Sequence, residues 1–311
     1  MRWLMGLALL SGCLPGKVSY GDVEVLPLVH PANDRNRWYV VVDTGEHGEH
    51  LFFLDTGYSI TTCDDAFAEA LSLPVKGRMM VRGDAGVLAA GRSVIPSMNI
   101  GGHRVENFRC MTRDLDSTSS IKDPKEVAVA GVIGADLLQH FYVTIDPTTA
   151  TVRLSDPHEM RLEKGADDVI RLPRENVWSP RRALAVELGG SKLHPVIDTG
   201  TSGTHIDGER LGLEWVRVRE GAIVRASGAD GMVVRDIYFY EEDIGFAGQQ
   251  LQGVSLISRE SVPWKDGLLG LNVLGQFHQE YDWRRGRARL VPIEGSDVPS
   301  WREWQHNHIK E

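Results

Sequence analysis

The feature that most constrains this chain is a turn that occurs twice. Residues 51–57 form an apolar run that ends in the tripeptide Asp-Thr-Gly, and residues 195–200 repeat this arrangement nearly half a chain later. The apolar run anchors such a turn in a core, and the glycine permits a backbone conformation that a side chain would forbid. The repeat therefore predicts two equivalent loops, each presenting one carboxylate.

A third Asp-Thr-Gly begins at Asp43 and has a different context. It leads into the polar stretch 46–50, which separates two apolar runs. This pattern is typical of a hairpin loop in water, so we interpret Asp43 as a turn residue. The matching hairpin of the second half is expected at 189–192, where Gly-Gly-Ser-Lys lacks the tripeptide.

The remainder of each half follows the same order. Residues 131–138 read Gly-Val-Ile-Gly-Ala-Asp-Leu-Leu, and residues 267–274 read Gly-Leu-Leu-Gly-Leu-Asn-Val-Leu. Such an alignment indicates duplication. We predict an N-terminal lobe over 22–155 and a C-terminal lobe over 169–295, joined by the polar connection 156–168.

Composition supports a β-rich globular protein. The chain has 311 residues, 42% hydrophobic, with 33 Gly and 14 Pro between short apolar runs. A net charge of −9 argues against nucleic acid as a partner. Residues 296–311 are expected to form a C-terminal tail, and His306 and His308 within it are expected to be solvated rather than metal ligands.

The N-terminal segment 1–13 has the layout of an export signal: an arginine, an apolar run too short to span a bilayer, and a small-residue end. Its Leu-Ser-Gly-Cys end resembles the bacterial lipobox, which implies a lipidated Cys13 carrying acyl chains such as palmitate. Several chains would anchor the protein stably to a membrane of the bacterial envelope, on its periplasmic or extracellular face. Residues 14–21 would then be a tether. An ordinary cleaved secretory signal is the alternative.

Cys63 and Cys110 both lie in the first half. In an oxidising compartment they would form a disulfide, and the alternative is two buried thiols. Neither has the sequence context of a nucleophile or a metal ligand.

These features resemble the pepsin-type and retropepsin-type aspartic peptidases over roughly 23–290. The family pattern is an apolar pair before Asp-Thr-Gly, followed later by two apolar residues and Gly; 132–134 and 268–270 fit this second element, which supports the catalytic loop. The resemblance implies an all-β acid-protease fold with a few short helices and two pseudo-twofold related, β-barrel-like lobes. The export signal and loop lengths are closer to retropepsin-like bacterial members.

The resemblance also implies an aspartic endopeptidase that needs no cofactor or metal. Asp55 and Asp198 would share one proton and activate a water against a peptide bond. The residues expected to support this pair are Thr56, Gly57, Ser59, Thr199, Gly200, Thr201 and Ser202. The two threonines are expected to bond across the lobe interface.

The residue after the first of these glycines, Tyr58, departs from the family pattern. In pepsins, the Ser or Thr that follows the glycine donates its hydroxyl to the aspartate of the same turn. Thr201 keeps such a hydroxyl. The Tyr58 hydroxyl is not at the same distance from the backbone. Losing a donor disfavours the charged carboxylate, so we expect a less acidic working pH than a pepsin's. Tyr58 could instead line the substrate pocket.

Two glycine-containing segments are candidate flaps over a substrate cleft. They hold Gly83 and Gly86 in the first half, and Gly228 and Gly231 in the second. Ordinary surface loops are the alternative. The first segment lacks the tyrosine usual in pepsin flaps, which leaves a retropepsin-like flap or weak clamping of the substrate.

Two other functions remain open at this stage. One is a catalytically weak peptide-binding or interaction lipoprotein on the same fold. The other is metal-dependent hydrolysis through His47 and His50, which lack an ordered third ligand. The leading hypothesis is a monomeric, lipid-anchored endopeptidase whose partner is its polypeptide substrate.

Overall fold

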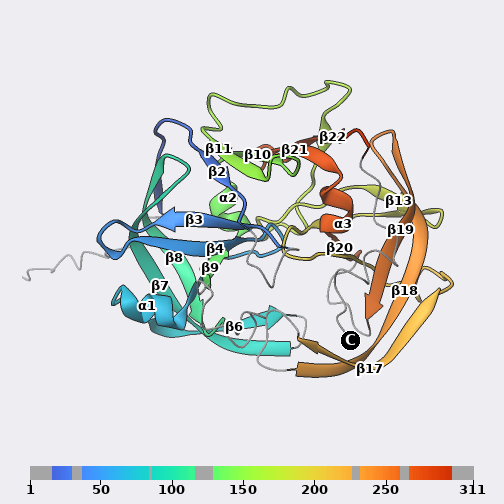
Figure 1. Ribbon diagram of the computed structural model, residues 1–311, viewed down its shortest axis with the longest axis horizontal. Helices are drawn as coiled ribbons and strands as arrows, with labels where there is room; N and C mark the ends of the chain where they lie inside the picture. Colours follow the sequence, from blue (N-terminus) through green and yellow to red (C-terminus); the bar gives the residue numbers. More distant parts are fainter. Residues whose placement is uncertain are drawn as a thin grey trace, which may run out of the picture.

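The protein folds into two β-rich lobes joined by a shared sheet, as a computed structural model shows (Figure 1). The first lobe runs from blue to green and the second from yellow to red. The residues described are 16–29, 37–83, 86–115, 129–225, 232–259 and 266–295. Cys13 and the tail 296–311 lie outside them. The expected all-β, bilobal fold is confirmed.

An eight-stranded sheet curls around the core of the first lobe, in the order β1-β8-β5-β9-β4-β3-β7-β6. Side chains along β8 alternate between buried and exposed on either side of Asn107, an exposed residue with φ +53° that interrupts the pattern. One face of the strand therefore lies in the core. The strands are β1 (Lys17–Ser19), β3 (Tyr39–Asp43), β4 (Glu49–Leu54), β5 (Thr62–Asp64), β6 (Lys76–Gly83), β7 (Gly86–Ile100), β8 (His103–Arg113) and β9 (Val129–Ile133).

The second lobe repeats this plan with a sheet in the order β14-β13-β18-β19-β16-β20-β15, to which β17 adds beside β18. The turn at Gly189 and Gly190 joins β13 to β14, where the sequence predicts a hairpin. The strands are β13 (Val186–Leu188), β14 (Ser191–Leu193), β15 (Val196–Ile197), β16 (Thr204–His205), β17 (Arg217–Arg225), β18 (Met232–Phe246), β19 (Gln249–Arg259) and β20 (Leu268–Leu269).

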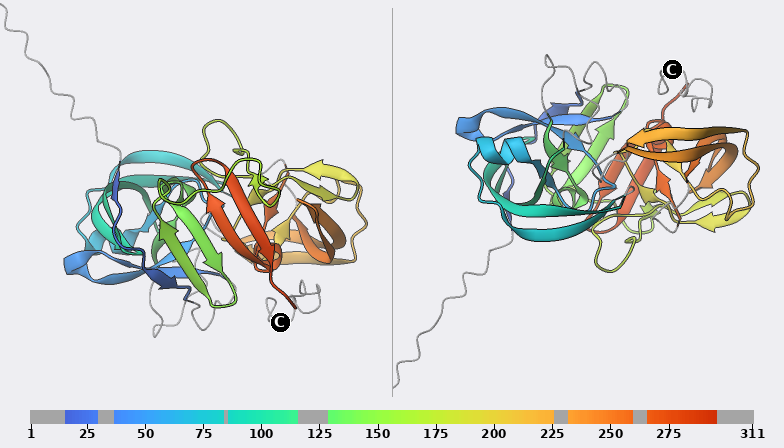
Figure 2. Two further views of the ribbon diagram at one scale, coloured as in Figure 1. Left: turned by 90° about the horizontal axis from the view of Figure 1, so that it is seen from above. Right: turned by 90° about the horizontal axis from the view of Figure 1, so that it is seen from below.

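A six-stranded sheet joins the two halves of the chain, in the order β12-β22-β21-β10-β11-β2. At its centre β10 of the first half pairs antiparallel with β21 of the second, so the seam between the halves is itself hydrogen-bonded. Figure 2 shows these strands lying between the lobes. They are β2 (Val25–Pro27), β10 (Tyr142–Asp146), β11 (Thr151–Ser155), β12 (Ile170–Arg171), β21 (Phe277–Asp282) and β22 (Arg287–Pro292).

The helices of the described residues are short. They are η1 (Gly45–His47), α1 (Asp65–Ala70), α2 (Ala135–Leu138) and α3 (Leu271–Leu274). Asp64 caps α1 by accepting a 2.8 Å hydrogen bond from the Ala66 N–H. Within the described residues, no helix is long and apolar enough to cross a membrane.

The segment predicted to be a tether contains a strand. β1 pairs antiparallel with β8, and just beyond it the Tyr20 hydroxyl donates to His140 O at 2.7 Å. The Gly21 N–H donates to the ring Nδ1 of His103 at 3.2 Å. Residues 17–21 therefore belong to the first lobe, because the free edge of β8 offers their backbone groups hydrogen-bond partners.

Cys63 and Cys110 form a disulfide, which decides between the two alternatives left by the sequence. Their strands, β5 and β8, are neighbours that pair in parallel. Both cysteines are buried. The disulfide therefore fastens the strand that follows the first Asp-Thr-Gly turn to the long strand at its side.

Candidate functional site

Each Asp-Thr-Gly turn begins where its strand ends beside the second repeated element. β4 pairs in parallel with β9, and β15 with β20. The Asp55 N–H donates to Ile133 O and the Asp198 N–H to Leu269 O, both at 3.0 Å. The two apolar-apolar-Gly segments thus support the turns from behind, as the family resemblance implies.

The two threonines bond across the lobe interface. Thr56 Oγ1 donates to Ile197 O at 2.8 Å and accepts from the Thr199 N–H at 3.0 Å. In the mirrored contacts, Thr199 Oγ1 donates to Leu54 O at 2.8 Å and accepts from the Thr56 N–H at 3.1 Å. Both side chains are buried. Four reciprocal hydrogen bonds therefore fix the two turns against each other.

This arrangement brings the carboxyl groups of Asp55 and Asp198 into direct hydrogen-bond contact. Both residues are buried, at 8% and 7% exposure. A Cβ on Gly57 would lie 2.3 Å from the Asp198 carboxyl carbon, and one on Gly200 would lie 2.2 Å from Asp55 Oδ2. Glycine is thus required at both positions, because any side chain would displace the opposite carboxylate.

Burial dominates the electrostatics of the pair and raises the pKa of Asp55 to about 6. The hydrogen bond with Asp198, the backbone N–H groups of Gly57 and Tyr58, and the charge of Arg37 oppose this rise without cancelling it. Two carboxyl groups in contact cannot both ionise at low cost, so the pair titrates as one coupled unit. A shared proton leaves one group able to accept a proton and the other able to donate one.

The polar residues after each glycine lie in the same turns. Gly200 N–H donates to Asp198 Oδ1 at 2.8 Å, and Ser202 O accepts from the Asn272 N–H at 2.9 Å. The hydroxyl of Thr201 has two partners, Gly203 O at 3.2 Å and the His205 ring at 3.0 Å. Asp198 is not among them, so the donation expected from the family resemblance does not occur.

On the first-lobe side, Tyr58 and Ser59 are both half-buried just beyond Gly57. Tyr58 O accepts a 2.8 Å hydrogen bond from the Ala135 N–H, as Thr201 O does at 2.9 Å from the Leu271 N–H in the second lobe. Both turns therefore rest on the helix that follows their supporting strand.

Two further polar residues support the turns and were not singled out from the sequence. Asp136 Oδ1 accepts hydrogen bonds from the N–H and the hydroxyl of Thr61, both at 2.7 Å. In the second lobe Asn272 Oδ1 accepts from the Thr204 hydroxyl at 2.8 Å. Asp136 and Asn272 are each the only strongly polar residue in the aligned apolar repeats 131–138 and 267–274. This position in the repeat is a sequence signal from which a supporting role could be predicted. Burial raises the pKa of Asp136 to about 6.

Arg181 is a supporting residue that no sequence pattern indicated. It comes from the second half, yet its Nη1 donates to Gly57 O at 3.0 Å. Its Nε also donates to Glu175 at 2.9 Å, and the two side chains are only 16% and 21% exposed. The first Asp-Thr-Gly turn is therefore held from the opposite half by a largely buried ion pair.

The candidate flaps are long hairpins, one per lobe, that project toward the middle of the molecule (Figure 1). In the first, Gly83 and Gly86 form the last pair of β6 and β7 before the tip. In the second, β17 and β18 pair from Arg217 to Arg225, and Gly228 and Gly231 lie outside the described residues. Both hairpins carry a register shift, which increases local twist.

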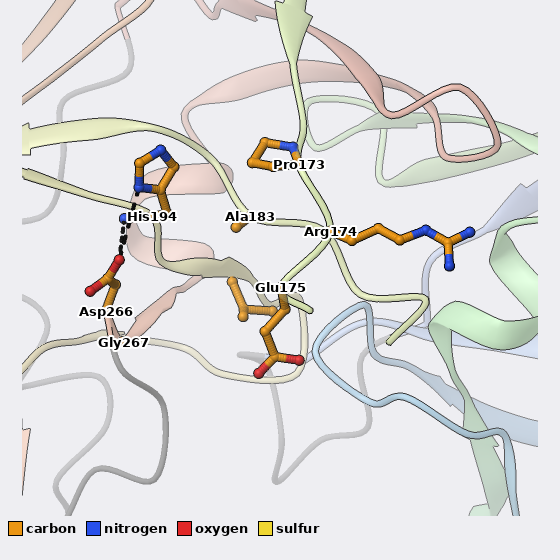
Figure 3. Close-up of a pocket in the computed structure, with 8 residues that line it drawn as sticks. Pro173, Arg174, Glu175, Ala183, His194, Asp266 and Gly267 are labelled. Carbon is orange, nitrogen blue, oxygen red and sulfur yellow. Dashed lines mark hydrogen bonds and ion pairs between the residues drawn. The ribbon is translucent and has the colours of Figure 1, made fainter. Parts of the chain in front are cut away.

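Figure 3 shows a cavity of about 280 Å³ on the second lobe, apart from the carboxyl pair. Val196, where β15 starts, lines it, whereas Asp198 follows the end of that strand. Asp266 holds the backbone and ring of His194 on one side, and Arg174 points away from Glu175 on the other. The lining residues are Pro173, Arg174, Glu175, Ala183, His194, Val196, Asp266 and Gly267.

The two histidines considered as metal ligands lie in different surroundings. His47 ends η1 beside the Glu46 carboxylate, and the His50 ring packs edge-on against Phe67 with centroids 4.9 Å apart. Across the part of the chain that the structure describes, no group of three or more His, Cys, Asp or Glu side chains is arranged to hold a metal ion.

Sequence comparison agrees with this geometry. Residues 40–137 match the aspartyl protease family. The matched segment holds the Asp55 turn, the β6–β7 hairpin and the supporting strand β9, and it ends within α2. No curated protein matches the chain. The family match supports a place in the aspartic peptidase superfamily, and the second lobe repeats the architecture of the matched segment.

Proposed function

We propose that this chain is an aspartic endopeptidase that hydrolyses peptide bonds with Asp55 and Asp198. The observation that carries the proposal is the contact between these two buried carboxyl groups, made across the lobe interface by equivalent turns. A protein that only binds peptides has no need to bury two acids against each other, since this arrangement costs free energy unless a proton is shared. One chain supplies both groups, so the enzyme would act as a monomer.

The proposed mechanism uses one proton shared within the pair. The ionised carboxylate takes a proton from a water, and that water attacks the peptide carbonyl. The protonated carboxyl polarises the carbonyl and later helps deliver a proton to the leaving amine. Asp55 Oδ1 is buried and has no hydrogen-bond partner among the described residues, so it is suited to accept from such a water.

The proposed subtype is retropepsin-like rather than pepsin-like. The support is the pair of matching hairpins, β6–β7 and β17–β18, which gives each lobe its own flap. No tyrosine occurs in β6, so a pepsin-type flap tyrosine is missing. The neutral-shifted pKa of Asp55 supports a working pH that is less acidic than a pepsin's.

We further propose that Cys13 is lipidated and anchors the enzyme to a bacterial envelope membrane. The support is the export-signal layout and the Leu-Ser-Gly-Cys motif. Expression of the full chain and of Cys13→Ser, with metabolic labelling by a fatty acid, tests this. Label and membrane association are expected for the full chain and not for the variant; an unlabelled, released full chain would refute the anchor.

The function is tested by incubating residues 16–311 with a peptide library between pH 3 and 8, beside Asp55→Asn and Asp198→Asn. Cleavage is expected in the unmodified protein, unaffected by chelators, and lost in both variants. Asparagine keeps the shape of each side chain but removes the shared proton, so folding is retained and can be checked by thermal unfolding. Cleavage that survives in either variant would refute the assignment. Peptide binding without cleavage would favour the interaction-lipoprotein alternative.

A further inference from the structure

The strand that follows the Asp198 turn contains a histidine where the first lobe has a threonine. His205 is the second residue of β16 and is buried, at 6% exposure. Its ring Nε2 lies 3.0 Å from the Thr201 hydroxyl, which also lies 3.2 Å from Gly203 O. The hydroxyl therefore has two partners within its own turn.

A hydroxyl has one hydrogen, and in this geometry that hydrogen is donated either to Gly203 O or to the His205 ring. If Thr201 donates to Gly203 O, its oxygen accepts from the ring N–H of His205; otherwise it donates to the ring nitrogen. In both cases no hydrogen remains for a carboxylate. Thr201 directly follows Gly200, whose N–H bonds to Asp198 Oδ1 at 2.8 Å, and the family resemblance implies a hydroxyl at this position that donates to the same carboxyl group.

We propose that His205 is a positioning residue that withholds the Thr201 hydroxyl from Asp198 and thereby keeps the working range of the carboxyl pair less acidic. The inference rests on the proposed peptidase function. A hydrogen bond donated to a carboxylate favours its charged form, so withholding the donor favours the protonated form. The imidazole acts only through Thr201 and takes no part in proton transfer to the substrate.

The described contact of the His205 ring with a functional group of this site is the one with Thr201. Its register partners on the two flanking strands are apolar: Ile257 on β19 and Leu268 on β20. Asp207 and Asp266 are charged groups that the structure describes on the adjoining loops, and both are in ion pairs with Arg210. Among the described residues 198–205, the other titratable group besides His205 is Asp198.

The first lobe has a different residue at the position equivalent to His205. Thr61 and Thr204 are equivalent, because each bonds to the polar residue of its supporting helix, Asp136 or Asn272. Thr62 therefore stands where the second lobe has His205, and its hydroxyl donates locally to Ile60 O at 3.1 Å. The contact between His205 and Thr201 therefore has no counterpart at Thr62.

The experiment compares His205→Leu with the unmodified protein, both in the native background and in Thr201→Val. The readouts are the acid limb of the kcat/KM profile and the carboxyl ¹³C NMR titration of the aspartates, which does not depend on turnover. His205→Leu is expected to move the acid limb and the pair's lower apparent pKa down by about one pH unit. In the Thr201→Val background, the same substitution is expected to move neither.

Two further variants serve as controls. His205→Gln keeps an amide at the position of Nε2 and should retain the native profile. His205→Asn, whose amide is too short to reach Thr201, should reproduce the acid shift and replaces His205→Leu if leucine prevents folding. An unmoved titration in His205→Leu and His205→Asn, or a shift that persists without the Thr201 hydroxyl, would overturn the inference. Absence of cleavage in the unmodified protein would refute the proposed function instead, and the NMR titration would still decide the role of His205.

Discussion

Arg181 in the second half of the chain donates a 3.0 Å hydrogen bond to the carbonyl oxygen of Gly57 in the first. Gly57 in turn lies against the Asp198 carboxyl group, so this contact helps to set the distance between the two acids. The guanidinium is preorganised by Glu175, which makes the contact a rigid one.

Arg181→Met is therefore expected to lower the free energy of unfolding by about 1.5–3 kcal/mol, the usual effect of losing a buried hydrogen bond from a charged group. Chemical denaturation measures this loss. Arg181→Met with Glu175→Gln should recover part of it, because no unpaired carboxylate then remains buried. If the single variant unfolds at the same denaturant concentration as the unmodified protein, the contact does not stabilise the fold.

Thr56→Val should weaken the interface between the turns. The substitution keeps the shape of the side chain but removes a buried hydroxyl that bonds to Ile197 O and the Thr199 N–H, and it leaves both of these groups unsatisfied. We expect a loss of about 2–3 kcal/mol in unfolding free energy and about a 100-fold fall in kcat/KM from misplaced carboxyl groups. Thr56→Ser is the matched control, since it retains the hydroxyl; equal damage by both variants would contradict the explanation.

Asp136 predicts a specific pH dependence of stability. Burial raises its pKa from 3.8 to about 6, so the folded protein binds more protons than the unfolded chain between these values. Its contribution is therefore present below about pH 4 and falls as the pH rises to about 6, by about 2–3 kcal/mol. Asp55 adds a contribution of the same sign.

Asp136→Asn tests this contribution, because Asn272 shows that an amide fits the equivalent site of the second lobe. The variant should show a flatter dependence of unfolding free energy on pH between 4 and 6. Denaturant titrations at closely spaced pH values measure it, with Asn272→Asp as the reciprocal change. An unaltered pH dependence in Asp136→Asn would place the proton uptake elsewhere.

The disulfide should contribute to stability in the first lobe. Cys63 and Cys110 are 47 residues apart, for which the chain-entropy model gives about 4 kcal/mol. The double variant Cys63→Ala with Cys110→Ala should therefore unfold at a lower temperature than the oxidised protein, and a reductant should destabilise only the latter. Identical unfolding with and without reductant would show that the bond does not form in solution.

Much of the fold follows from local sequence. Apolar runs ending at Asp-Thr-Gly and the apolar-apolar-Gly segments specify strands, turns and their glycines within a few residues, and their repetition specifies two lobes. Asp43 differs from the two buried copies because a polar stretch precedes the next apolar run on its C-terminal side. In the structure Asp43 ends β3 and accepts from the Gly45 N–H at 2.8 Å, as a turn residue would.

Which strands and turns form, and that they occur twice, can be predicted from the sequence because these depend on residues close together in the chain. The pairing of Cys63 with Cys110, the contact of Arg181 with Gly57 and the contact of His205 with Thr201 are visible in the folded structure alone. These contacts depend on where packing places side chains, since a hydrogen bond or disulfide forms only within a narrow range of distance and angle. Repetition in a sequence specifies equivalent backbones, and packing then gives the two equivalent turns different partners.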